Sequence, residues 1–479
     1  MPENYWREDD YKQDIDPISS ILSELSDPEA EEEEFRSDFF QGLSGRRRKA
    51  AFVLMAIWGI TIGLYLVPWG HWAVLGFTAI LIIQAIRLVS AKPQPTPQPL
   101  SDDAFVDAPS VSLLIAAKNE EAVIGNLVRM LCNLDYPIDK YEVWVIDDHS
   151  TDKTPVLLNN LAKEYPQLKV LHRLAGAGGG KSGALNQVLP LTKGEIIAVF
   201  DADAKVSQDL LRRVIPMFEA QEMGAVQVRK AIANAPLNFW TKGQSTEMAL
   251  DSYFQQQRIA LGGIGELRGN GQFVRRSALE RCGGWNEQTI TDDLDLTIRL
   301  HLDQWKIGFL QFPEVEEEGV TGAIALWHQR NRWAEGGYQR YLDYWRLIIS
   351  NRMGLQKTID LLSFVLIQYL LPTAAVPDMV MSITRHRFPV LIPLTGLMLS
   401  LSFWAMFTGL RRTRTEEEFR FSDLLSLLLQ SLRGMIYMIH WLIIMPSITA
   451  RMSVRAKRLK WVKTIHEGSS DESFEYQAE

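Results

Sequence analysis

The sequence predicts an α/β fold, in which a parallel sheet is covered by helices on both faces and flanked by apolar spans. In residues 111–200, short apolar runs alternate with segments of helical periodicity, the pattern of buried parallel strands joined by helices. Polar clusters begin where these runs end, and ligands of such sheets bind at the carboxyl ends of the strands. We therefore expect a ligand site along one edge of the sheet.

Apolar stretches on both sides of this block are each close to the ~20 residues that cross a bilayer. They are residues 51–69, 72–89, 361–383, 388–410 and 424–448. Residues 46–49 (Arg-Arg-Arg-Lys) precede the first stretch, and the short turn after it carries no Lys or Arg. The positive-inside rule then places both flanks of this hairpin, and the block that follows it, in the cytoplasm.

The C-terminal stretches leave the number of spans open at four to six. Arg411 and Arg412, and the basic segment 451–463, both favour the cytoplasm, yet one ordinary span between them would separate them. Arg433 and Gly434 interrupt the last stretch. Part of this stretch could therefore lie along the membrane surface or form a hairpin.

Composition divides the chain into segments. The first 44 residues hold most of the acidic surplus behind the net charge of −8, which predicts a solvated tail or an acidic arm that binds a partner. The polar N-terminus predicts no cleavable signal peptide. Two cysteines are too few for a disulfide framework, which predicts a reducing compartment, and the apolar run around Cys132 predicts that this thiol is buried. The expected segments are a disordered acidic tail (1–45), a two-span hairpin (46–91), a linker (92–109), a cytoplasmic catalytic domain (110–345), interfacial and transmembrane helices (346–450) and a basic then acidic tail (451–479).

Two acidic clusters follow predicted buried strands. Asp147 and Asp148 could accept hydrogen bonds from a uracil ring nitrogen or a ribose hydroxyl, although a turn and helix cap would use the same residue types. Asp201 and Asp203 emerge at the tip of a fully apolar run, and their spacing lets both reach one hard cation. Oxygen ligands suit Mg²⁺ or Mn²⁺ bridged to a diphosphate.

A glycine-rich segment, residues 176–182, ends in Gly-Lys-Ser. It does not complete a phosphate-binding loop, because Ala175 stands where that pattern needs glycine. We expect a mobile loop that brings Lys181 near a diphosphate rather than an NTPase site.

A third acidic cluster precedes an amphipathic helix that runs to Leu302. Asp292 or Asp295 could be a first-turn carboxylate favoured by the helix dipole. Asp293 could instead be a general base, provided that it reaches an acceptor hydroxyl. Upstream, residues 268–272 form a glycine-rich polar turn that could contact a sugar or the acceptor, or be a plain loop.

The last polar cluster is Gln-Arg-Asn-Arg-Trp at residues 329–333. Arginine can pair bidentately with phosphate oxygens, and tryptophan supplies a flat platform for an acceptor or sugar. An exposed basic helix near the membrane surface would have the same composition.

These clusters, in this order, resemble the inverting glycosyltransferases of family 2, which have a GT-A fold with a Rossmann-like mixed or parallel sheet. The resemblance covers about residues 110–345 and departs at Asp292, where the family has Glu. It implies that Asp293 is the catalytic base. The other roles implied are uridine contact by Asp147 and Asp148, metal and diphosphate binding by Asp201 and Asp203, with Asp203 most directly on the metal, and diphosphate and acceptor binding by Gln329, Arg332 and Trp333.

The resemblance also implies a reaction. A hydroxyl deprotonated by Asp293 attacks the anomeric carbon opposite the departing nucleotide, so an α-linked donor gives a β-glycoside. The order of segments along the chain is similar to that of the glycolipid synthases of this family: an acidic tail, a two-span hairpin, the catalytic block and a short C-terminal membrane region. That similarity implies UDP-glucose as donor, 1,2-diacylglycerol as acceptor, Mg²⁺ (or Mn²⁺) as cofactor and the lipid bilayer as partner, with no nucleic acid. A processive polysaccharide synthase and a membrane-anchored nucleotide-binding protein remain as alternatives.

Overall fold

The structure is a computed structural model that describes residues 45–414 and 421–454. These described residues belong to one compact unit. The predicted acidic N-terminal tail and nearly all of the predicted C-terminal tail lie outside the described residues.

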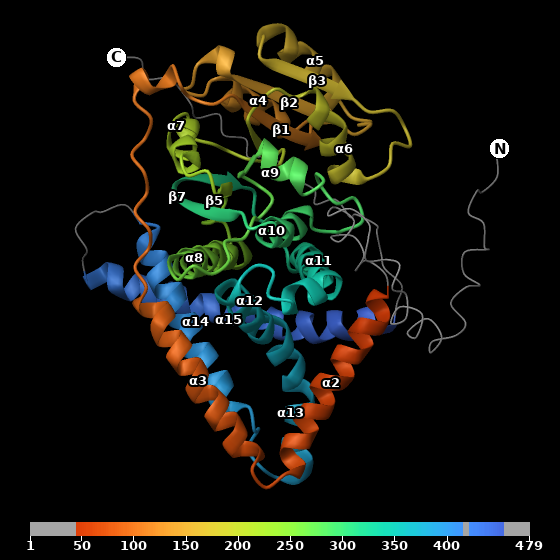
Figure 1. The fold of residues 1–479 in the computed structure, drawn as a ribbon, viewed down its shortest axis with the longest axis vertical. Helices are drawn as coiled ribbons and strands as arrows, with labels where there is room; N and C mark the ends of the chain where they lie inside the picture. Colours follow the sequence, from red (N-terminus) through yellow and green to blue (C-terminus); the bar gives the residue numbers. More distant parts are fainter. Residues whose placement is uncertain (1–44, 415–420, 455–479) are drawn as a thin grey trace, which may run out of the picture. The chain divides into compact units, whose positions relative to one another are not determined.

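A mixed sheet of seven described strands forms the core of the block that carries the polar clusters, in the order β3-β2-β1-β4-β6-β5-β7 (Figure 1). The strands β3, β2, β1 and β4 are parallel to one another, whereas β6 runs antiparallel to both β4 and β5. The predicted α/β fold is therefore confirmed, and β6 makes its sheet mixed. The strands are β1 Val111–Ala117, β2 Tyr141–Asp147, β3 Leu168–His172, β4 Ile196–Phe200, β5 Met223–Ile232, β6 Gln272–Arg275 and β7 Lys306–Glu317.

Helices cover both faces of the sheet because its inner strands are apolar on both faces. In β1, Leu113 and Ile115 belong to one hydrophobic core and Leu114 to the other, as the alternation of a strand requires. The first core contains residues of α4 Ile124–Cys132, α5 Thr154–Glu164 and α7 Leu210–Val214, and the second contains residues of α6 Gly180–Val188, α9 Arg276–Arg281 and α10 Asp292–Leu302. Cys132 is a buried free thiol, as predicted, and Cys282 is also free and buried. Short 3₁₀ helices are η4 Asp102–Phe105, η5 Ile138–Lys140, η6 Leu189–Leu191 and η7 Ile215–Phe218.

Strand register brings the polar clusters to one edge of the sheet. Asp147, the last residue of β2, pairs with Ala117, the last residue of β1. Asp201 follows β4 at the same edge, because β4 is parallel to β1. β6 begins there as well, since it is antiparallel and its Gln272 pairs with Val199 near the end of β4. Loops that are distant in sequence therefore meet at this edge.

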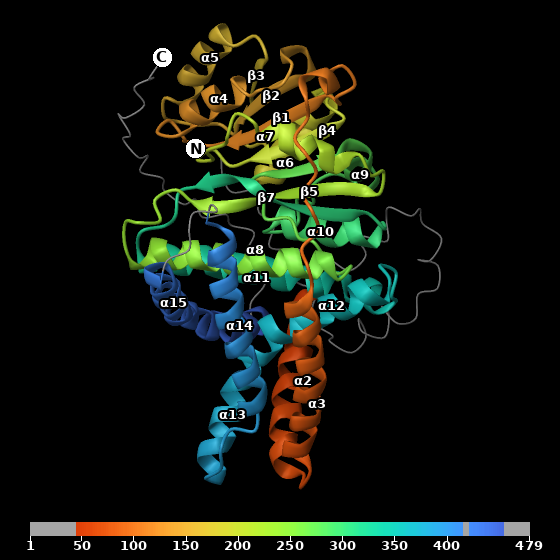
Figure 2. The ribbon, with the colours of Figure 1, turned by 90° about the vertical axis from the view of Figure 1, so that its left-hand side faces the viewer.

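Two long helices lie between the sheet and the apolar helices (Figure 2). They are α8, Phe239–Ala260, and α11, Ala323–Ile349. The Asn238 side chain caps α8 by accepting hydrogen bonds from the backbone N–H groups of Trp240 and Thr241.

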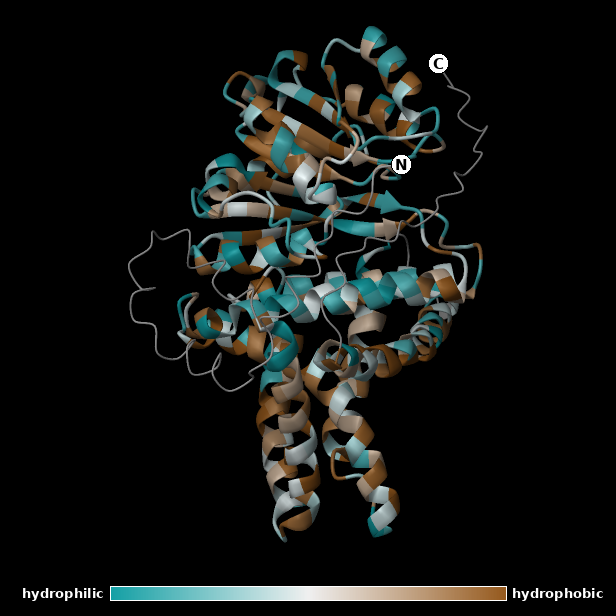
Figure 3. Cartoon of the chain, turned by 90° about the vertical axis from the view of Figure 1, so that its right-hand side faces the viewer, coloured by the Kyte–Doolittle hydropathy of each residue, from teal (hydrophilic) through white to brown (hydrophobic). Residues whose placement is uncertain are grey.

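Five of the described helical segments are long and apolar enough to cross a membrane, by length and composition. Apolar residues dominate the helices that lead away from the sheet (Figure 3). The five segments are α2 Arg46–Leu66, α3 Gly70–Ser90, the continuous helix Leu355–Arg385, α14 Ile392–Arg412 and α15 Phe421–Val454. The helix Leu355–Arg385 comprises α12 Leu355–Val365, the π-helical turn η8 Leu366–Leu370 and α13 Leu371–Arg385.

The last helix, α15, differs from the others in direction. Figures 1 and 2 show α2, α3 and α13 leading away from the sheet, whereas α15 lies across them. Its 34 residues span about 51 Å, well beyond the ~30 Å of a hydrocarbon core. One face is exposed and apolar along the helix, at spacings of three or four residues, which is typical of a helix in the plane of a membrane. That face carries Leu425, Leu429, Leu432, Ile436, Ile439 and Ile443.

The first candidate span, α2, is attached to α11 by a buried ion pair. Arg46, the first residue of α2, pairs with Asp343 of α11, and its Nε donates to Asp343 Oδ1 at 2.6 Å. Its Nη1 also donates to the carbonyl of Gln288. Arg46, one of the basic residues from which the orientation of the hairpin was predicted, therefore also connects the hairpin to α11.

Candidate active site

A cavity of ≈ 680 Å³ lies at the edge of the sheet where β1, β2 and β4 end. Its wall contains every site residue predicted from the sequence except Asp147. Those residues are Asp148, Lys181, Asp201, Asp203, Asp293, Gln329, Arg332 and Trp333. Phe364, Gln368 and Tyr369 of the helix Leu355–Arg385, with Trp441 and Met445 of α15, also line it. The cavity thus connects the strand ends to the apolar helices.

Asp148 is held in place by the backbone and by an arginine. Its N–H donates to the carbonyl of Ala117 at 2.8 Å, and its Oδ1 accepts a hydrogen bond from Arg173 Nη1 at 2.6 Å. Arg173 is buried and also donates to the carbonyl of Gly178, so it joins the end of β2 to the glycine-rich segment. Sequence reasoning missed Arg173, although it directly follows the apolar run of β3.

Asp147 has a different environment from its neighbour. It is buried outside the cavity wall, and its Oδ1 accepts a hydrogen bond from Ser150 N at 3.0 Å. Its Oδ2 lies 2.8 Å from His172 Nδ1. These contacts are those of a turn-forming carboxylate, and they order the loop that presents Asp148.

Lys181 contacts the carboxylate at the tip of β4. Its Nζ lies 2.5 Å from Asp201 Oδ1. Burial lowers the pKa of the Lys181 ammonium, but the charges of Asp201, Asp292 and Asp293 outweigh burial and raise that pKa above its usual value. The ammonium is therefore charged at neutral pH, and the glycine-rich segment holds it beside the carboxylate of Asp201.

Asp201 and Asp203 carry carboxylate oxygens of the kind that bind a hard cation, but they do not form a complete metal site by themselves. Asp203 Oδ2 accepts a hydrogen bond from Glu318 N at 2.9 Å. Within residues 45–414 and 421–454, no three carboxylate, imidazole or thiol groups converge on one position. A cation held by two carboxylates takes its remaining ligands from phosphate oxygens and water, which is usual for Mg²⁺. The donors present therefore fit Mg²⁺ or Mn²⁺ that arrives with a diphosphate.

Asp293 is the second residue of α10 and is half-buried on the cavity wall. Gly269 passes so close that a Cβ there would lie 3.4 Å from Asp293 Oδ2, and its φ of +80° also favours glycine. Burial and the charge of Asp292 raise the pKa of Asp293 to about 6. A carboxylate with this pKa is a stronger base than usual and is still ionised at neutral pH.

The two neighbouring carboxylates of α10 differ in role. Asp292 also lines the cavity, and its buried Oδ2 has no hydrogen-bond partner among the described residues. Asp295 is buried in the protein, where it accepts hydrogen bonds from Arg299 Nε and Tyr344 OH, each at 2.8 Å. The first-turn structural carboxylate expected from the sequence thus corresponds to Asp295.

The cluster at residues 329–333 is not an exposed basic helix, because Arg330 is completely buried. The Arg330 guanidinium lies 4.0 Å from the centre of the Trp333 ring, and Lys230 Nζ lies 5.5 Å from it. Arg330 Nη1 also donates to Gln329 Oε1 at 2.6 Å. Arg330 therefore fixes the two side chains, Gln329 and Trp333, that face the cavity. Burial lowers the pKa of Arg332, although Asp201 and Asp293 oppose this effect.

Glu247 of α8 joins this cluster to α15. It pairs with Arg330 Nη2, and it accepts hydrogen bonds from Tyr437 OH at 3.0 Å and Trp441 Nε1 at 2.8 Å. Burial raises the pKa of Glu247, but the charge of Arg330, the charge of His440 and the hydrogen bonds from Trp441 and Arg330 together outweigh burial and lower that pKa below its usual value. Glu247 lies in no motif, so sequence reasoning could not have found it.

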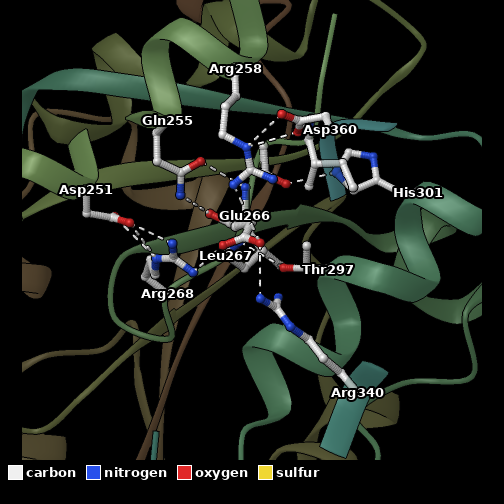
Figure 4. A network of polar contacts seen from close by, with 12 residues as sticks. Asp251, Gln255, Arg258, Glu266, Leu267, Arg268, Thr297, His301, Arg340 and Asp360 are labelled. Carbon is white, nitrogen blue, oxygen red and sulfur yellow. Dashed lines mark hydrogen bonds and ion pairs between the residues drawn. The ribbon is translucent and has the colours of Figure 1, made fainter. Parts of the chain in front are cut away.

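A second buried carboxylate, Glu266, holds two arginines on the cavity wall (Figure 4). Glu266 Oε2 lies 2.6 Å from Arg268 Nη1, and Oε1 accepts a hydrogen bond from Arg340 Nη2 at 3.1 Å. Burial raises the pKa of Glu266, but Arg340, Arg268 and Arg258 outweigh it and keep that pKa well below its usual value. Arg268 belongs to the predicted polar turn, whereas Arg340 was not predicted.

Comparison with known proteins shows the family to which the chain is related. Residues 108–336 match the family described as glycosyltransferase like family 2. The beta-monoglucosyldiacylglycerol synthase of Synechocystis sp. (strain ATCC 27184 / PCC 6803 / Kazusa) is 60% identical over 99% of each chain. The protein of that name from Nostoc sp. (strain PCC 7120 / SAG 25.82 / UTEX 2576) is 61% identical over 98% of this chain and 100% of its own. A solved mannosyltransferase, PcManGT from Pyrobaculum calidifontis in complex with GDP-Man and Mn²⁺, is 20% identical over 79% of this chain and 98% of its own, with a TM-score of 0.49.

The fold and the carboxylates at the strand ends define a glycosyltransferase of the GT-A type, and the chain is an enzyme of that class. It belongs to the family of the beta-monoglucosyldiacylglycerol synthases, within the family 2 glycosyltransferases.

Proposed function

We propose that this membrane-associated enzyme transfers glucose from UDP-glucose to the free hydroxyl of 1,2-diacylglycerol and so forms beta-monoglucosyldiacylglycerol. The observation that carries the proposal is the continuous cavity, which has Asp148 and Lys181 at the strand ends and Phe364 and Met445 in the apolar helices. A water-soluble nucleotide and an apolar acceptor could therefore occupy one site. The names of the two full-length relatives support this reaction.

The polar end of the cavity fits the nucleotide sugar. Asp148 faces the cavity from the tip of β2 and would accept hydrogen bonds from the uridine. Lys181 and Arg332 line the same cavity and would pair with the diphosphate. Asp147 would act indirectly, through the loop that it orders.

The carboxylates after β4 fit a divalent cation, which we propose to be Mg²⁺, with Mn²⁺ as the other cation suited to these ligands. Asp203 and Asp201 would hold it, with the diphosphate completing its ligands. When bound, the cation supplies positive charge opposite the leaving diphosphate.

In this proposal Asp293 performs the proton transfer. With the acceptor hydroxyl at Asp293, the carboxylate takes the proton while the hydroxyl oxygen bonds to the anomeric carbon of the glucose. The bond from that carbon to the UDP oxygen breaks at the same time, and UDP leaves with the electron pair. Attack from the face opposite UDP converts the α-linked donor into a β-glucoside. Lys181 and Arg332 would stabilise the charge that develops on the diphosphate.

The arrangement of helices supports a cytoplasmic catalytic block with four spans. Arg46 at the start of α2 and Arg412 at the end of α14 both contact this block, Arg412 through hydrogen bonds to Gln256 and Gln257 of α8. If α15 lies in the membrane plane, Arg411 and Arg412 at the end of α14 and Arg451 in the last turn of α15 remain on the cytoplasmic side, as the positive-inside rule requires.

Purified full-length enzyme, offered labelled UDP-glucose and dioleoylglycerol in micelles, should yield one lipid-extractable product that β-glucosidase cleaves. The same assay with other UDP-sugars tests the choice of donor. Label recovered only in a polymer that lipid solvents do not extract would contradict the proposal and favour a polysaccharide synthase. Nucleotide hydrolysis without transfer would favour the nucleotide-binding alternative.

A further inference from the structure

We infer that Arg340 recognises the ester carbonyls of the acceptor, so that this side chain sets the preference of the enzyme for a diacyl over a dialkyl glycerol. The inference rests on the proposed function, because it requires a glycerolipid acceptor at Asp293. Arg340 lies outside the motifs of residues 329–333 and 291–293 and is placed by contacts that only the fold creates.

Contacts within the fold connect Arg340 to the segment that passes beside Asp293. Arg268 adjoins Gly269, which passes beside Asp293, and Glu266 joins Arg268 to Arg340 through its two oxygens. Arg340 is therefore connected to the surroundings of Asp293 through Glu266, which contacts both Arg340 and Arg268. It is also next to the apolar helices, since its neighbour Tyr341 packs against Tyr369 with ring centres 5.4 Å apart.

The buried guanidinium of Arg340 has N–H groups that could still donate hydrogen bonds. Arg340 is 2% exposed and lines the cavity. Its Nη2 donates to Glu266 and to Tyr341 OH, whereas its Nε and Nη1 have no hydrogen-bond partner within the part of the chain that the structure describes. A buried guanidinium N–H without an acceptor lowers the stability of the fold. In a ligand cavity, a bound ligand that supplies the acceptor removes this cost.

The balanced charges around Arg340 favour an uncharged hydrogen-bond acceptor on the ligand. Arg258, Arg268 and Arg340 lie in one network with the three carboxylates Asp251, Glu266 and Asp360 (Figure 4). Three positive charges are therefore balanced by three negative charges. A phosphate would bring an unbalanced charge into this buried network, whereas a carbonyl oxygen accepts the hydrogen bonds without adding charge.

The shape of diacylglycerol fits this position. Its ester carbonyls lie within a few bonds of the free hydroxyl, so they fall close to Asp293 when that hydroxyl is activated. Its acyl chains would then extend along the apolar wall formed by Phe364, Tyr369 and Met445. Arg340 would lie between the reacting hydroxyl and the apolar chains.

The experiment compares dioleoylglycerol with its dialkyl ether analogue, which has the same hydroxyl and chain length but no carbonyls. The natural enzyme should use the diacyl acceptor with a kcat/KM higher on the order of tenfold, as expected when hydrogen bonds to a charged group are lost. Arg340→Met should reduce this ratio to about one. Arg340→Lys, which keeps the charge beside Glu266, should give an intermediate ratio.

Arg258→Lys is the matched control, because Arg258 also contacts Glu266 but does not line the cavity. It should change the rates with both acceptors by the same factor and leave their ratio unaltered. An unchanged ratio in Arg340→Met, or no preference in the natural enzyme, would overturn the inference while leaving the proposed function intact. Absence of any glucolipid from either acceptor would instead overturn the proposed function.

Discussion

The two ends of the cavity are built in different ways. At the polar end, Asp148, Asp201 and Asp293 lie in short loops or at a helix start, directly after or beside strands. At the apolar end, Glu247, Arg340 and Trp441 come from three long helices, α8, α11 and α15. Substitutions at the polar end should therefore remove chemistry with little loss of stability, whereas those at the apolar end should alter acceptor use and stability together.

The strongest test of this contrast is Asp293→Asn. Loss of the general base should lower kcat by roughly 10³-fold, within the 10²–10⁴ that such a group contributes. UDP-glucose should bind nearly as well as before, because Asp293 is assigned to the acceptor. Product formation and calorimetric binding of UDP-glucose measure the two effects, and a large loss of nucleotide affinity would place Asp293 at the donor.

Stability provides the control for this variant. The raised pKa of Asp293 means that its carboxyl favours folding below its unfolded pKa and loses that contribution as pH rises through about 6. At pH 7.5 the neutral Asn should therefore stabilise the protein, by about 1 kcal/mol. Asp295→Asn should instead destabilise it by about 3 kcal/mol, because it breaks a buried pair with Arg299. Thermal unfolding in detergent distinguishes the two outcomes.

The metal assignment predicts the next largest effect. Chelation should abolish transfer, and Asp203→Asn should raise the Mg²⁺ concentration for half-maximal activity by about 10–100-fold. Asp209→Asn is a suitable control, since Asp209 pairs with Arg213 outside the cavity. If Asp203→Asn and Asp209→Asn require the same Mg²⁺ concentration, Asp203 does not hold the cation.

Glu247→Gln tests the apolar end. It keeps atoms that can bond Trp441 and Tyr437 but removes the charge opposite Arg330, so we expect activity to fall roughly tenfold and stability by about 3 kcal/mol. Rates with diacyl and dialkyl acceptors should fall equally, unlike those of Arg340→Met. Glu222→Gln, at an exposed pair with Lys306, should leave both activity and melting temperature unchanged. Full activity with lowered stability would limit Glu247 to a structural role.

The last prediction, an effect of similar size, concerns pH. Because burial raises the pKa of Asp293 to about 6, the ionised base is largely present at pH 7 and lost below pH 6. The value of kcat/KM should fall about tenfold from pH 7 to pH 5 as this single group is protonated. A rate that stays level to pH 5 would show that Asp293 has an ordinary carboxyl pKa or is not the base.

Sequence reasoning succeeded where function depends on short segments. The apolar runs before Asp148 and Asp201 predicted β2 and β4, and their parallel order placed both carboxylates at one edge of the sheet. It was less successful where function depends on tertiary contacts. The helix α8 and the strands β5 and β7 were not predicted. Glu247, Glu266 and Arg340 were missed as well, because each forms its ion pairs beside the cavity with residues that are distant in the sequence. Asp147 shows the remaining ambiguity, since two adjacent carboxylates read alike in sequence but face different surroundings.

The buried pair between Arg46 and Asp343 has a practical consequence. Asp343 is on the helix that carries Gln329, Trp333 and Arg340, so the first residue of the first span is part of the support of the active site. Expressing the glycosyltransferase block alone, cut within the linker after α3, would leave Asp343 buried without its cation. Protein production and inhibitor screening should therefore begin with fragments that keep Arg46 and the hairpin, in detergent or lipid, rather than with an excised water-soluble piece.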